Sequence, residues 1–434
     1  MTVSRRSLIT AAGAAALGAS VRAAATTTAA EPALGSPSIG HGHRAVRTLN
    51  GWTLPHKVVG GVKEFHLVAE EVEHEFAPGC KAKCWGYNGG TPGPTIEATE
   101  GDRVRILVTN RLPEPTSIHW HGILLPSGMD GVSGLSQPSI GPGETFAYEF
   151  TLRQHGTHMY HPHADEMVQM AVGMMGLFVI HPAAGEPLPI DRDFAFLLHN
   201  WSLHPGTFRP DPSIMLDFDL WTFNSRVFPA IEPLVVRAGE RVRIRIGNLS
   251  MYNHPIHLHG HEFEVTGGDG GRWPRDRWRK EVTEIVGVGQ MRDIEFVAAP
   301  GDWALHCHMS HHTMNAMGHG IPNVLGARIS DSDADLEALL PGMMNMGANG
   351  MSEHQEHVEA MNLPGPANTL PMMGGTGPYG ALEMGGMFTV VKVRHGLEAE
   401  DFRDPGWYSA PKGTVARMIS EDPDYGAPVR RPPT

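Results

Sequence analysis

The sequence has no run of basic residues and no long apolar segment. Lys and Arg number 34 against 47 Asp and Glu, for a formal net charge of −13, so we do not expect a nucleic-acid-binding surface. The same negative charge favours attraction of small cations, including metal ions. The apolar run near the N-terminus is short and rich in Ala and Gly, which argues against a membrane span.

Cysteine is scarce, with 3 residues in 434. Cys80 and Cys84 would lie about 13 Å apart in a regular strand, which is too far for a disulfide. A bent segment could bridge them, and an additional metal site is a third alternative, so their state stays open. Cys307 stands apart from both, in a histidine-rich run.

No clear amphipathic helix separates the strand-like segments of the chain. The 52 Gly and 35 Pro instead mark turns between short segments. Residues 102–108 and 240–246 both alternate polar and apolar side chains, follow a glycine and precede a His-X-His-Gly motif. We interpret both as antiparallel strands and predict an all-β fold with a β-sandwich in each half.

The histidines form a duplicated pattern. His-Trp-His-Gly at residues 119–122 returns as His-Leu-His-Gly at residues 257–260, roughly 140 residues later. A second pair of motifs, at residues 156–163 and 301–308, repeats a glycine followed by a His-X-His pair. Only the second copy holds a cysteine. The chain therefore looks like two copies of one unit that share one metal system.

Strand geometry predicts which of these side chains lie together. Successive side chains point to opposite faces, so His306 and His308 share one face of their strand and Cys307 takes the other. His254 stands an odd number of residues before His257, and in an extended segment it faces the side opposite to His257. That places His254 with Cys307.

Further ligands follow the cysteine along the chain. Two His, one Cys thiolate and a weak axial Met form a blue-copper electron-transfer site, and His254, Cys307, His312 and Met317 supply such a set. His311 is an alternative to His312, and an ordinary buried cysteine with a core methionine is the alternative to the whole site. The positions of the first repeat that align with His254, Cys307 and His312 hold none of these ligands; they are Thr116, Pro162 and Met167. The first half therefore lacks a blue-copper site.

Together these motifs resemble the multicopper oxidases built from two cupredoxin domains, the small bacterial laccase type with its blue copper in the second domain. The resemblance covers most of residues 45–330. It implies two tandem cupredoxin-like Greek-key β-sandwiches that bind four coppers per functional unit, one of type 1, one of type 2 and two of type 3. It assigns His254, Cys307, His312 and Met317 to the type 1 copper, His119 and His257 to the type 2 copper, and His121, His161, His163, His259, His306 and His308 to the type 3 pair.

The resemblance also implies a reaction. One-electron donors reduce the blue copper, Cys307 passes the electrons through His306 and His308, and the trinuclear cluster reduces dioxygen to water with four electrons. Asp130 matches the family's proton-relay aspartate, although it could be only a turn residue. Thr313 stands where some relatives carry an acidic residue, so we expect no relay there. In two-domain relatives the cluster lies between chains, which implies a homotrimer; an intrachain cluster stays open.

A methionine-rich segment suggests the identity of the electron donor. Nine of the 45 residues from Met343 to Met387 are Met, and thioethers select Cu(I). The segment is either a site for cuprous-ion oxidation or an incidental insertion. Phenolic compounds and manganese are the other donors that we consider.

The N-terminus resembles a twin-arginine export signal, with Ser-Arg-Arg-Ser-Leu-Ile at residues 4–9. Such export leads to a periplasmic or extracellular location. We expect the signal at residues 1–30, the first cupredoxin domain without type 1 copper at 45–185, the second at 190–395 with a Met-rich insertion at 341–387, and an extended tail at 396–434.

Two other functions fit parts of the pattern. A copper nitrite reductase shares the architecture but carries its blue copper in the first domain, where Pro162 replaces the cysteine. A copper-sequestering tolerance protein without turnover would explain the methionines and the export. It would not explain the His-Cys-His run, which has no use without electron transfer.

Overall fold

The computed structural model describes residues 43–204, 206–216, 218–315, 368, 370 and 374–418. Within these ranges the chain is built almost entirely from strands, with α1 (Glu166–Ala171) as the one α-helix. Three short 3-10 turns complete the helical elements: η1 (Ser127–Met129), η2 (Arg275–Arg277) and η3 (Ser310–Thr313). The all-β prediction is confirmed. The described residues include no helix long and apolar enough to cross a membrane.

The first half of the chain, up to residue 181, contains two sheets. A five-stranded sheet has the order β2-β3-β6-β8, with β4 paired to β3, and a four-stranded sheet has the order β5-β10-β9-β7. The bounds are β2 (Lys57–Val59), β3 (Val62–Ala77), β4 (Cys80–Tyr87), β5 (Ile96–Thr99), β6 (Arg103–Asn110), β7 (His119–His121), β8 (Thr145–Thr151), β9 (Gly156–His161) and β10 (Gly176–His181).

The second half, together with β1 from the N-terminal segment, forms an eight-stranded and a five-stranded sheet. The eight-stranded sheet has the order β1-β11-β14-β20-β16-β17, with β12 on β11 and β18 on β16, and the five-stranded sheet has the order β13-β24-β21-β15-β19. A separate hairpin joins β22 to β23. The bounds are β1 (Arg47–Thr48), β11 (Arg192–Trp201), β12 (Leu220–Phe223), β13 (Leu234–Arg237), β14 (Arg241–Asn248), β15 (His254–Leu258), β16 (Phe263–Gly268), β17 (Gly271–Arg272), β18 (Arg279–Glu281), β19 (Thr283–Val286), β20 (Met291–Val297), β21 (Gly301–Cys307), β22 (Gly375–Gly377), β23 (Gly380–Leu382) and β24 (Phe388–Arg394).

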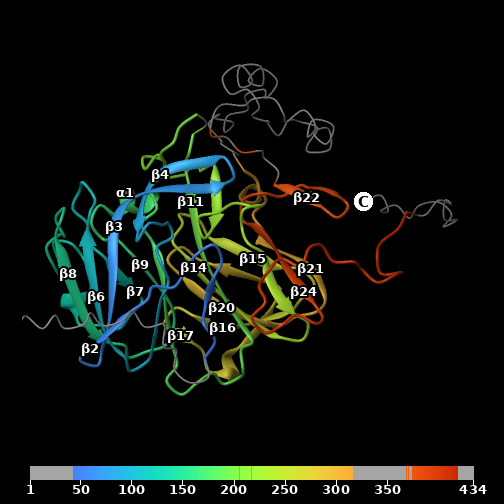
Figure 1. The fold of residues 1–434 in the computed structure, drawn as a ribbon, viewed down its shortest axis with the longest axis horizontal. Helices are drawn as coiled ribbons and strands as arrows, with labels where there is room; N and C mark the ends of the chain where they lie inside the picture. Colours follow the sequence, from blue (N-terminus) through green and yellow to red (C-terminus); the bar gives the residue numbers. More distant parts are fainter. Residues whose placement is uncertain are drawn as a thin grey trace, which may run out of the picture. The chain divides into compact units, whose positions relative to one another are not determined.

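The two halves repeat one topology. The strands β6 and β14 contain the two alternating segments of the sequence, and each lies antiparallel to one neighbour, β8 or β20, and parallel to the other, β3 or β11. The sequence analysis interpreted both segments as antiparallel strands, which is correct for one neighbour of β6 and one neighbour of β14. The parallel neighbour arises because a strand that returns by a long connection can lie beside an earlier strand in the same direction. Figure 1 shows β6 and β8 in blue to green and β14 and β20 in green to yellow-orange.

Three apolar cores stabilise this arrangement. One lies inside the first half around Trp120 and Phe178, and one lies inside the second half around Ile244 and Leu305. The third joins the halves, because Leu177 and its neighbours on β9 and β10 pack against β11. Every residue of β9, β10 and β11 is consequently buried, as expected for strands that are covered on both faces.

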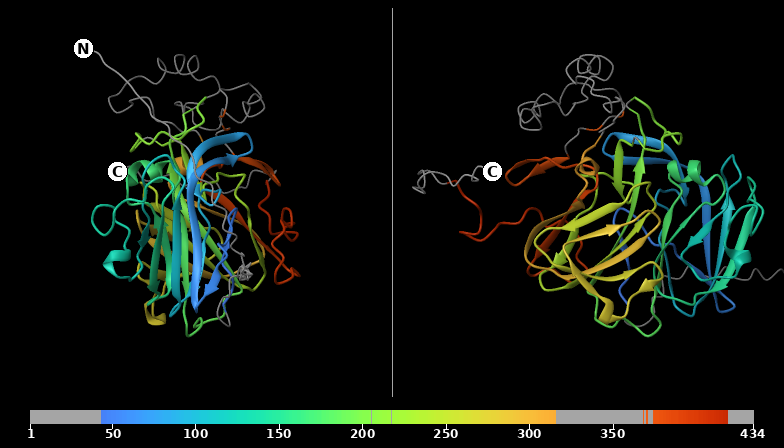
Figure 2. Two further views of the ribbon diagram at one scale, coloured as in Figure 1. Left: turned by 60° about the vertical axis from the view of Figure 1, so that its left-hand side comes forward. Right: turned by 180° about the vertical axis from the view of Figure 1, so that it is seen from behind.

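The long hairpin β3–β4 also connects the halves. Lys83 N donates a hydrogen bond to Phe208 O (2.8 Å), and His74 Nε2 lies 2.5 Å from Ser225 O. Figure 2 shows the blue hairpin beside green strands of the second half. Cys80 and Cys84 lie on β4, both buried and both free thiols, so the disulfide alternative is not realised.

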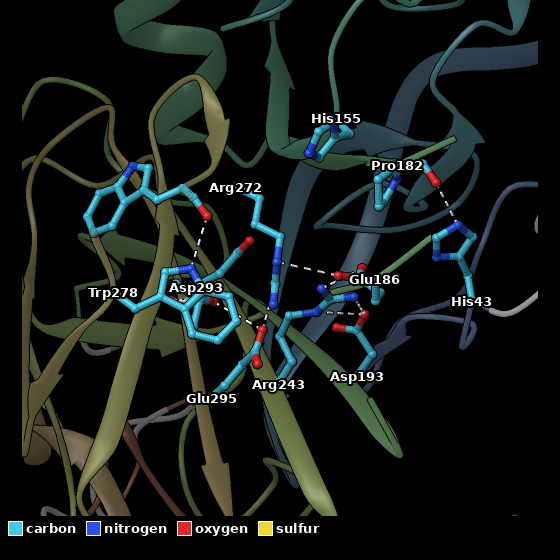
Figure 3. A network of polar contacts seen from close by, with 12 residues as sticks. His43, His155, Pro182, Glu186, Asp193, Arg243, Arg272, Trp278, Asp293 and Glu295 are labelled. Carbon is cyan, nitrogen blue, oxygen red and sulfur yellow. Dashed lines mark hydrogen bonds and ion pairs between the residues drawn. The ribbon is translucent and has the colours of Figure 1, made fainter. Parts of the chain in front are cut away.

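A buried ion-pair network lies at the joint between the halves (Figure 3). Asp193 is fully buried and accepts hydrogen bonds from Arg243 Nε (3.0 Å) and Arg245 Nε (2.9 Å). Arg243 also contacts Glu186, at 2.7 Å. Burial alone would raise the pKa of Asp193, but the two guanidinium groups lower it to about 2. A buried charge of this kind is tolerated only while its partners remain.

Replacing Asp193 with Ala should therefore destabilise the fold strongly. We expect a loss of roughly 3–5 kcal/mol in the free energy of unfolding, because two arginines lose a buried partner. Since the pKa of Asp193 is lowered on folding, its stabilisation is present above about pH 4 and is lost as the pH falls toward about 2. Urea unfolding across this pH range measures both effects.

Glu400→Ala provides the control, because the Glu400 side chain is 74% exposed and pairs with Arg44 at the surface. We expect a loss of less than about 0.5 kcal/mol for this variant. Equal losses in the two variants would contradict a stabilising role for the buried network.

Candidate metal centres

The first centre is a buried group formed by His254, Cys307 and His312, each 0% exposed. Strand β15 supplies His254, the end of β21 supplies Cys307, and η3 supplies His312. Cys307 Sγ lies 3.6 Å from His254 Nδ1 and 3.3 Å from His312 Nδ1, and the two nitrogens are 3.1 Å apart. These three ligand atoms can surround a single metal ion.

The hydrogen bonds of this centre determine which nitrogen of His254 is free to bind. Ser250 Oγ lies 2.7 Å from His254 Nε2 and also faces Asn248 Oδ1 (2.7 Å) and Tyr252 O (2.9 Å). Those two oxygens can only accept, so Ser250 donates its proton to one of them and accepts from His254 Nε2–H. The lone pair of His254 Nδ1 is therefore directed at Cys307. Burial lowers the pKa of His254 to about 3, so its imidazole is neutral at neutral pH, the form that binds a metal.

His312, rather than His311, completes this group. The Trp221 ring on β12 stacks on His312 with centroids 4.9 Å apart, whereas His311 packs edge-on against the same Trp221. Burial lowers the pKa of His312 to about 2 and raises the pKa of the Cys307 thiol to about 12. The backbone of Met387 joins the centre, accepting from Cys307 N (3.1 Å) and donating to His312 O (2.9 Å). Met317, the expected axial ligand, lies outside the described residues.

The second centre is a histidine quartet of the first half. His119 and His121 lie on β7, His161 ends β9 and His163 follows it, and the strand register pairs His119 with His161. The ring centroids of His119 lie 5.7, 5.3 and 5.7 Å from those of His121, His161 and His163. His121 Nδ1 and His161 Nε2 are 3.2 Å apart. The first repeat therefore brings its four predicted histidines together.

The third centre is the corresponding quartet of the second half: His257 lies on β15 and His306 on β21, and His259 and His308 follow these strands. The register pairs His257 with His306, as His119 pairs with His161. Ring centroids lie 4.8 Å apart for His257 and His259, and 5.5 Å apart for His306 and His308. His259 Nε2 and His306 Nε2 are 3.0 Å apart. His306 therefore lies in this quartet while its neighbour Cys307 lies in the buried group, as strand alternation predicted.

In both quartets, backbone carbonyls determine which ring nitrogen of a histidine carries the proton. His161 Nδ1 lies 2.9 Å from Pro162 O, and His306 Nδ1 lies 2.8 Å from Cys307 O. A carbonyl only accepts, so in both rings Nδ1 carries the proton and the Nε2 lone pair is free for a metal. His119 and His257 repeat this arrangement with carbonyls of other segments, Asp130 O (2.9 Å) and Val282 O (2.6 Å).

The two quartets remain separate within the chain. Among the described residues, every histidine–histidine ring contact of a quartet stays inside that quartet. His259 and His308 are exposed, and His119, His121 and His163 are partly exposed. Each quartet is thus an open, surface-facing set of ligands.

Two carboxylates adjoin the first quartet. Asp130 Oδ1 lies 3.3 Å from His119 Nδ1, as expected for the aspartate that the sequence indicated. Glu166, which the sequence analysis missed, lies 3.4 Å from His161 Nδ1 and 3.7 Å from His163 Nε2. The spacing of Glu166 could have identified it, because it stands three residues after His163, in the first turn of α1.

Comparison with known proteins supports one family. Two family models, both described as multicopper oxidase, match residues 69–185 and 207–324. Copper resistance protein A of Escherichia coli is 45% identical over 115 residues, which is 26% of this chain and 19% of that protein. A probable nitrite reductase-hydroxylamine oxidoreductase fusion protein of Kuenenia stuttgartiensis is 28% identical over 274 residues, 59% of this chain and 31% of that protein. The matches thus span less than a third of each of these relatives.

A solved structure matches a larger part of the chain than these two relatives do. The blue copper oxidase from Nitrosomonas europaea has a TM-score of 0.56 and 26% identity, and the match covers 76% of this chain and 85% of that one. This structural match and the two family matches cover the duplicated sheets and ligand motifs described above. The chain belongs to the multicopper oxidase family.

Proposed function

We propose that this protein couples one-electron oxidation of a donor at a type 1 copper to four-electron reduction of dioxygen to water at a trinuclear copper cluster. The observation that carries the proposal is the position of Cys307. It belongs to a buried Cys-His-His group, and its two chain neighbours, His306 and His308, belong to an open histidine quartet. This arrangement provides a short covalent path between two metal centres.

The residues fit the copper that the family implies. Two imidazoles and a thiol converge within 3.6 Å in the buried group, the donor set of a blue-copper site, and Met317 would add the weak axial ligand. A buried thiol with a raised pKa becomes a thiolate only beside a cation. The two quartets supply the eight imidazoles expected for the cluster: His119, His121, His161, His163, His257, His259, His306 and His308. When bound, copper supplies one-electron redox chemistry and the binding of dioxygen.

We infer that the cluster forms between chains of a homotrimer. Each quartet is open to the surface, and each would be completed by a quartet of the opposite type. A head-to-tail ring joins the first quartet of one copy to the second quartet of the next and uses every such interface.

In this proposal, the carboxylates beside the first quartet supply protons. Asp130 contacts His119 through its carbonyl and its side chain, and the side chain is 37% exposed. The Asp130 carboxylate can therefore exchange protons with water and transfer them to the quartet. Glu166 lies 3.4 Å from His161 Nδ1 and 3.7 Å from His163 Nε2 and adds a second carboxylate beside the quartet.

We propose cuprous ion as the donor, with phenolic compounds as the alternative. The methionines of the Met343–Met387 segment support a Cu(I) site, and a relative carries the name copper resistance protein A. Most of this segment lies outside the described residues. Export by a twin-arginine signal to the periplasm or beyond is part of the same proposal, and residues 1–42 lie outside the described ranges as well.

The nitrite reductase alternative lacks a feature that it needs. Such an enzyme carries its blue copper in the first domain, yet Pro162 follows His161 where Cys307 follows His306. Proline offers no thiolate, so the name of the Kuenenia relative does not transfer to this chain.

Cys307→Ser should abolish both the blue colour and oxygen uptake, because it removes the thiolate ligand and the electron path at once. The measurement is visible absorption and oxygen consumption of the copper-loaded protein. Cys84→Ser, which removes another buried thiol on β4, should keep both properties. Full turnover with an intact blue band in the Cys307→Ser protein would exclude the proposal.

Asp130→Asn should slow oxygen reduction without slowing electron entry. We expect kcat for oxygen uptake to fall roughly 100-fold, because a proton donor is lost. Anaerobic bleaching of the blue band by a phenolic donor should keep its rate. Asp276→Asn, an exposed aspartate of η2, is the matched control. If bleaching slows as much as oxygen uptake, Asp130 supports the fold rather than the proton path.

The donor can be tested without disturbing the blue centre. Met387 contacts Cys307 and His312, so deletion of the whole Met-rich segment would damage that centre. We therefore choose Leu substitutions that spare it, at Met343, Met344, Met346, Met351 and Met361. Leucine keeps the apolar volume and removes the thioether.

Oxygen uptake with Cu(I) should fall in this variant, while uptake with a phenolic donor should stay the same or rise. Unchanged Cu(I) oxidation would show that the methionines are incidental and would favour a laccase. No uptake with either donor, even by the unmodified protein, would favour copper sequestration without turnover.

A further inference from the structure

A fourth group of metal-ligand side chains lies where the two halves join, and none of the three centres above uses it. His43 precedes β1, His181 ends β10, and Glu186 stands in the linker to β11. One ligand atom from each lies within 4.8 Å of the other two. The sequence analysis did not group these residues, because His43 lies far from His181 and Glu186 in the chain.

The ring of His181 is oriented by a carboxylate. Its Nε2 lies 2.9 Å from Glu97 Oε2, and both side chains are 1% exposed. Glu97 also accepts hydrogen bonds from Val46 N (3.2 Å) and Thr53 Oγ1 (3.0 Å), so it is held as an acceptor. His181 Nε2 therefore donates, which leaves the lone pair on Nδ1 of the neutral ring. That Nδ1 is buried without a hydrogen-bond partner.

His43 is oriented in the same way by a carbonyl. Its Nε2 lies 2.8 Å from Pro182 O, and a carbonyl only accepts, so Nε2 carries the proton. Its Nδ1 is also buried without a partner. The two rings lie 5.0 Å apart with 32° between their planes. Two acceptor nitrogens cannot satisfy each other, and a shared cation would satisfy both.

Glu186 adds an anionic ligand atom. Arg243 Nη1 donates to its Oε1 at 2.7 Å, while Oε2 has no hydrogen-bond partner and lies 3.5 Å from Arg272 Nε. Both arginines have a second carboxylate, Asp193 for Arg243 and Glu295 for Arg272. Figure 3 shows Glu186 between Arg272 and His43. Glu186 Oε2 accepts no hydrogen bond, so it can bind a cation, which would share this carboxylate with the two arginines.

Convergence distinguishes this group from other buried histidines. His56, His158 and His199 also have a buried ring nitrogen without a partner. Within the described ranges, however, none of these three belongs to a group of converging ligand atoms. Their unpaired nitrogens carry no proposal.

We propose that His43, His181 and Glu186 bind one divalent cation such as Zn²⁺, with water as a fourth ligand. Two imidazoles and one carboxylate suit borderline cations that prefer tetrahedral sites. Ligand atoms around such a cation lie roughly 3.3–3.5 Å apart, so side-chain rotations must draw this group slightly closer. The ion fastens the N-terminal segment, through His43, to the end of β10 and the linker that follows it.

Zinc binding to the fully copper-loaded protein tests this proposal. Equilibrium dialysis with elemental analysis should give one Zn²⁺ per chain with unchanged copper content. His43→Ala should weaken this uptake at least about tenfold, because one of three protein ligands is lost. Added Zn²⁺ should raise the melting temperature of the unmodified protein and leave that of His43→Ala unchanged.

His155→Ala is the matched control, because His155 lies nearby and pairs with Glu100 instead (3.2 Å). It should keep full zinc uptake. Glu97→Gln should weaken uptake roughly tenfold through loss of ring orientation. His43→Gln, which keeps a donor for Pro182 O, replaces His43→Ala if the latter unfolds. Absence of zinc uptake by the unmodified protein, or uptake by both His43 variants equal to that of the unmodified protein, overturns the proposal.

Discussion

The arrangement of the metal centres depends on the alternation of side chains along β21. Because neighbouring residues of a strand point to opposite faces, Cys307 enters a buried group while His306 enters an open quartet. The register with β15 then places His257 opposite His306 and Ile256 opposite Cys307. One pair of strands thus builds two centres back to back, and no loop has to connect them.

The sequence predicted this part of the site because the signal is local. Motif spacing and two-residue alternation were enough to place His254 with Cys307 and to separate both from His257. The same reasoning left His311 and His312 open, because η3 interrupts the strand and alternation no longer applies. The structure places His312 in the group, 3.3 Å from Cys307 Sγ and stacked on Trp221, a residue of β12 that no local pattern connects to residue 312.

Contacts between distant segments could not be predicted from the sequence. Each half was correctly predicted to be a β-sandwich, but the burial of all of β9, β10 and β11 arises from how the halves pack. The group at His43 has the same origin. Its three members come from the N-terminal segment, a strand end and the linker, so only the folded chain brings them together.

The packed joint also bears on our proposal that a trinuclear cluster forms between chains. The core between the halves contains Met159, Leu177 and Leu197, each at most 1% exposed, together with many neighbours. Closing the two quartets on each other inside one chain would require the halves to separate, at a cost of roughly 1.5–3 kcal/mol for each large apolar side chain exposed. Joining the quartets of different copies leaves this core intact. This packing supports our proposal of a cluster between chains, in which the exposed His259 and His308 would face a quartet of another copy.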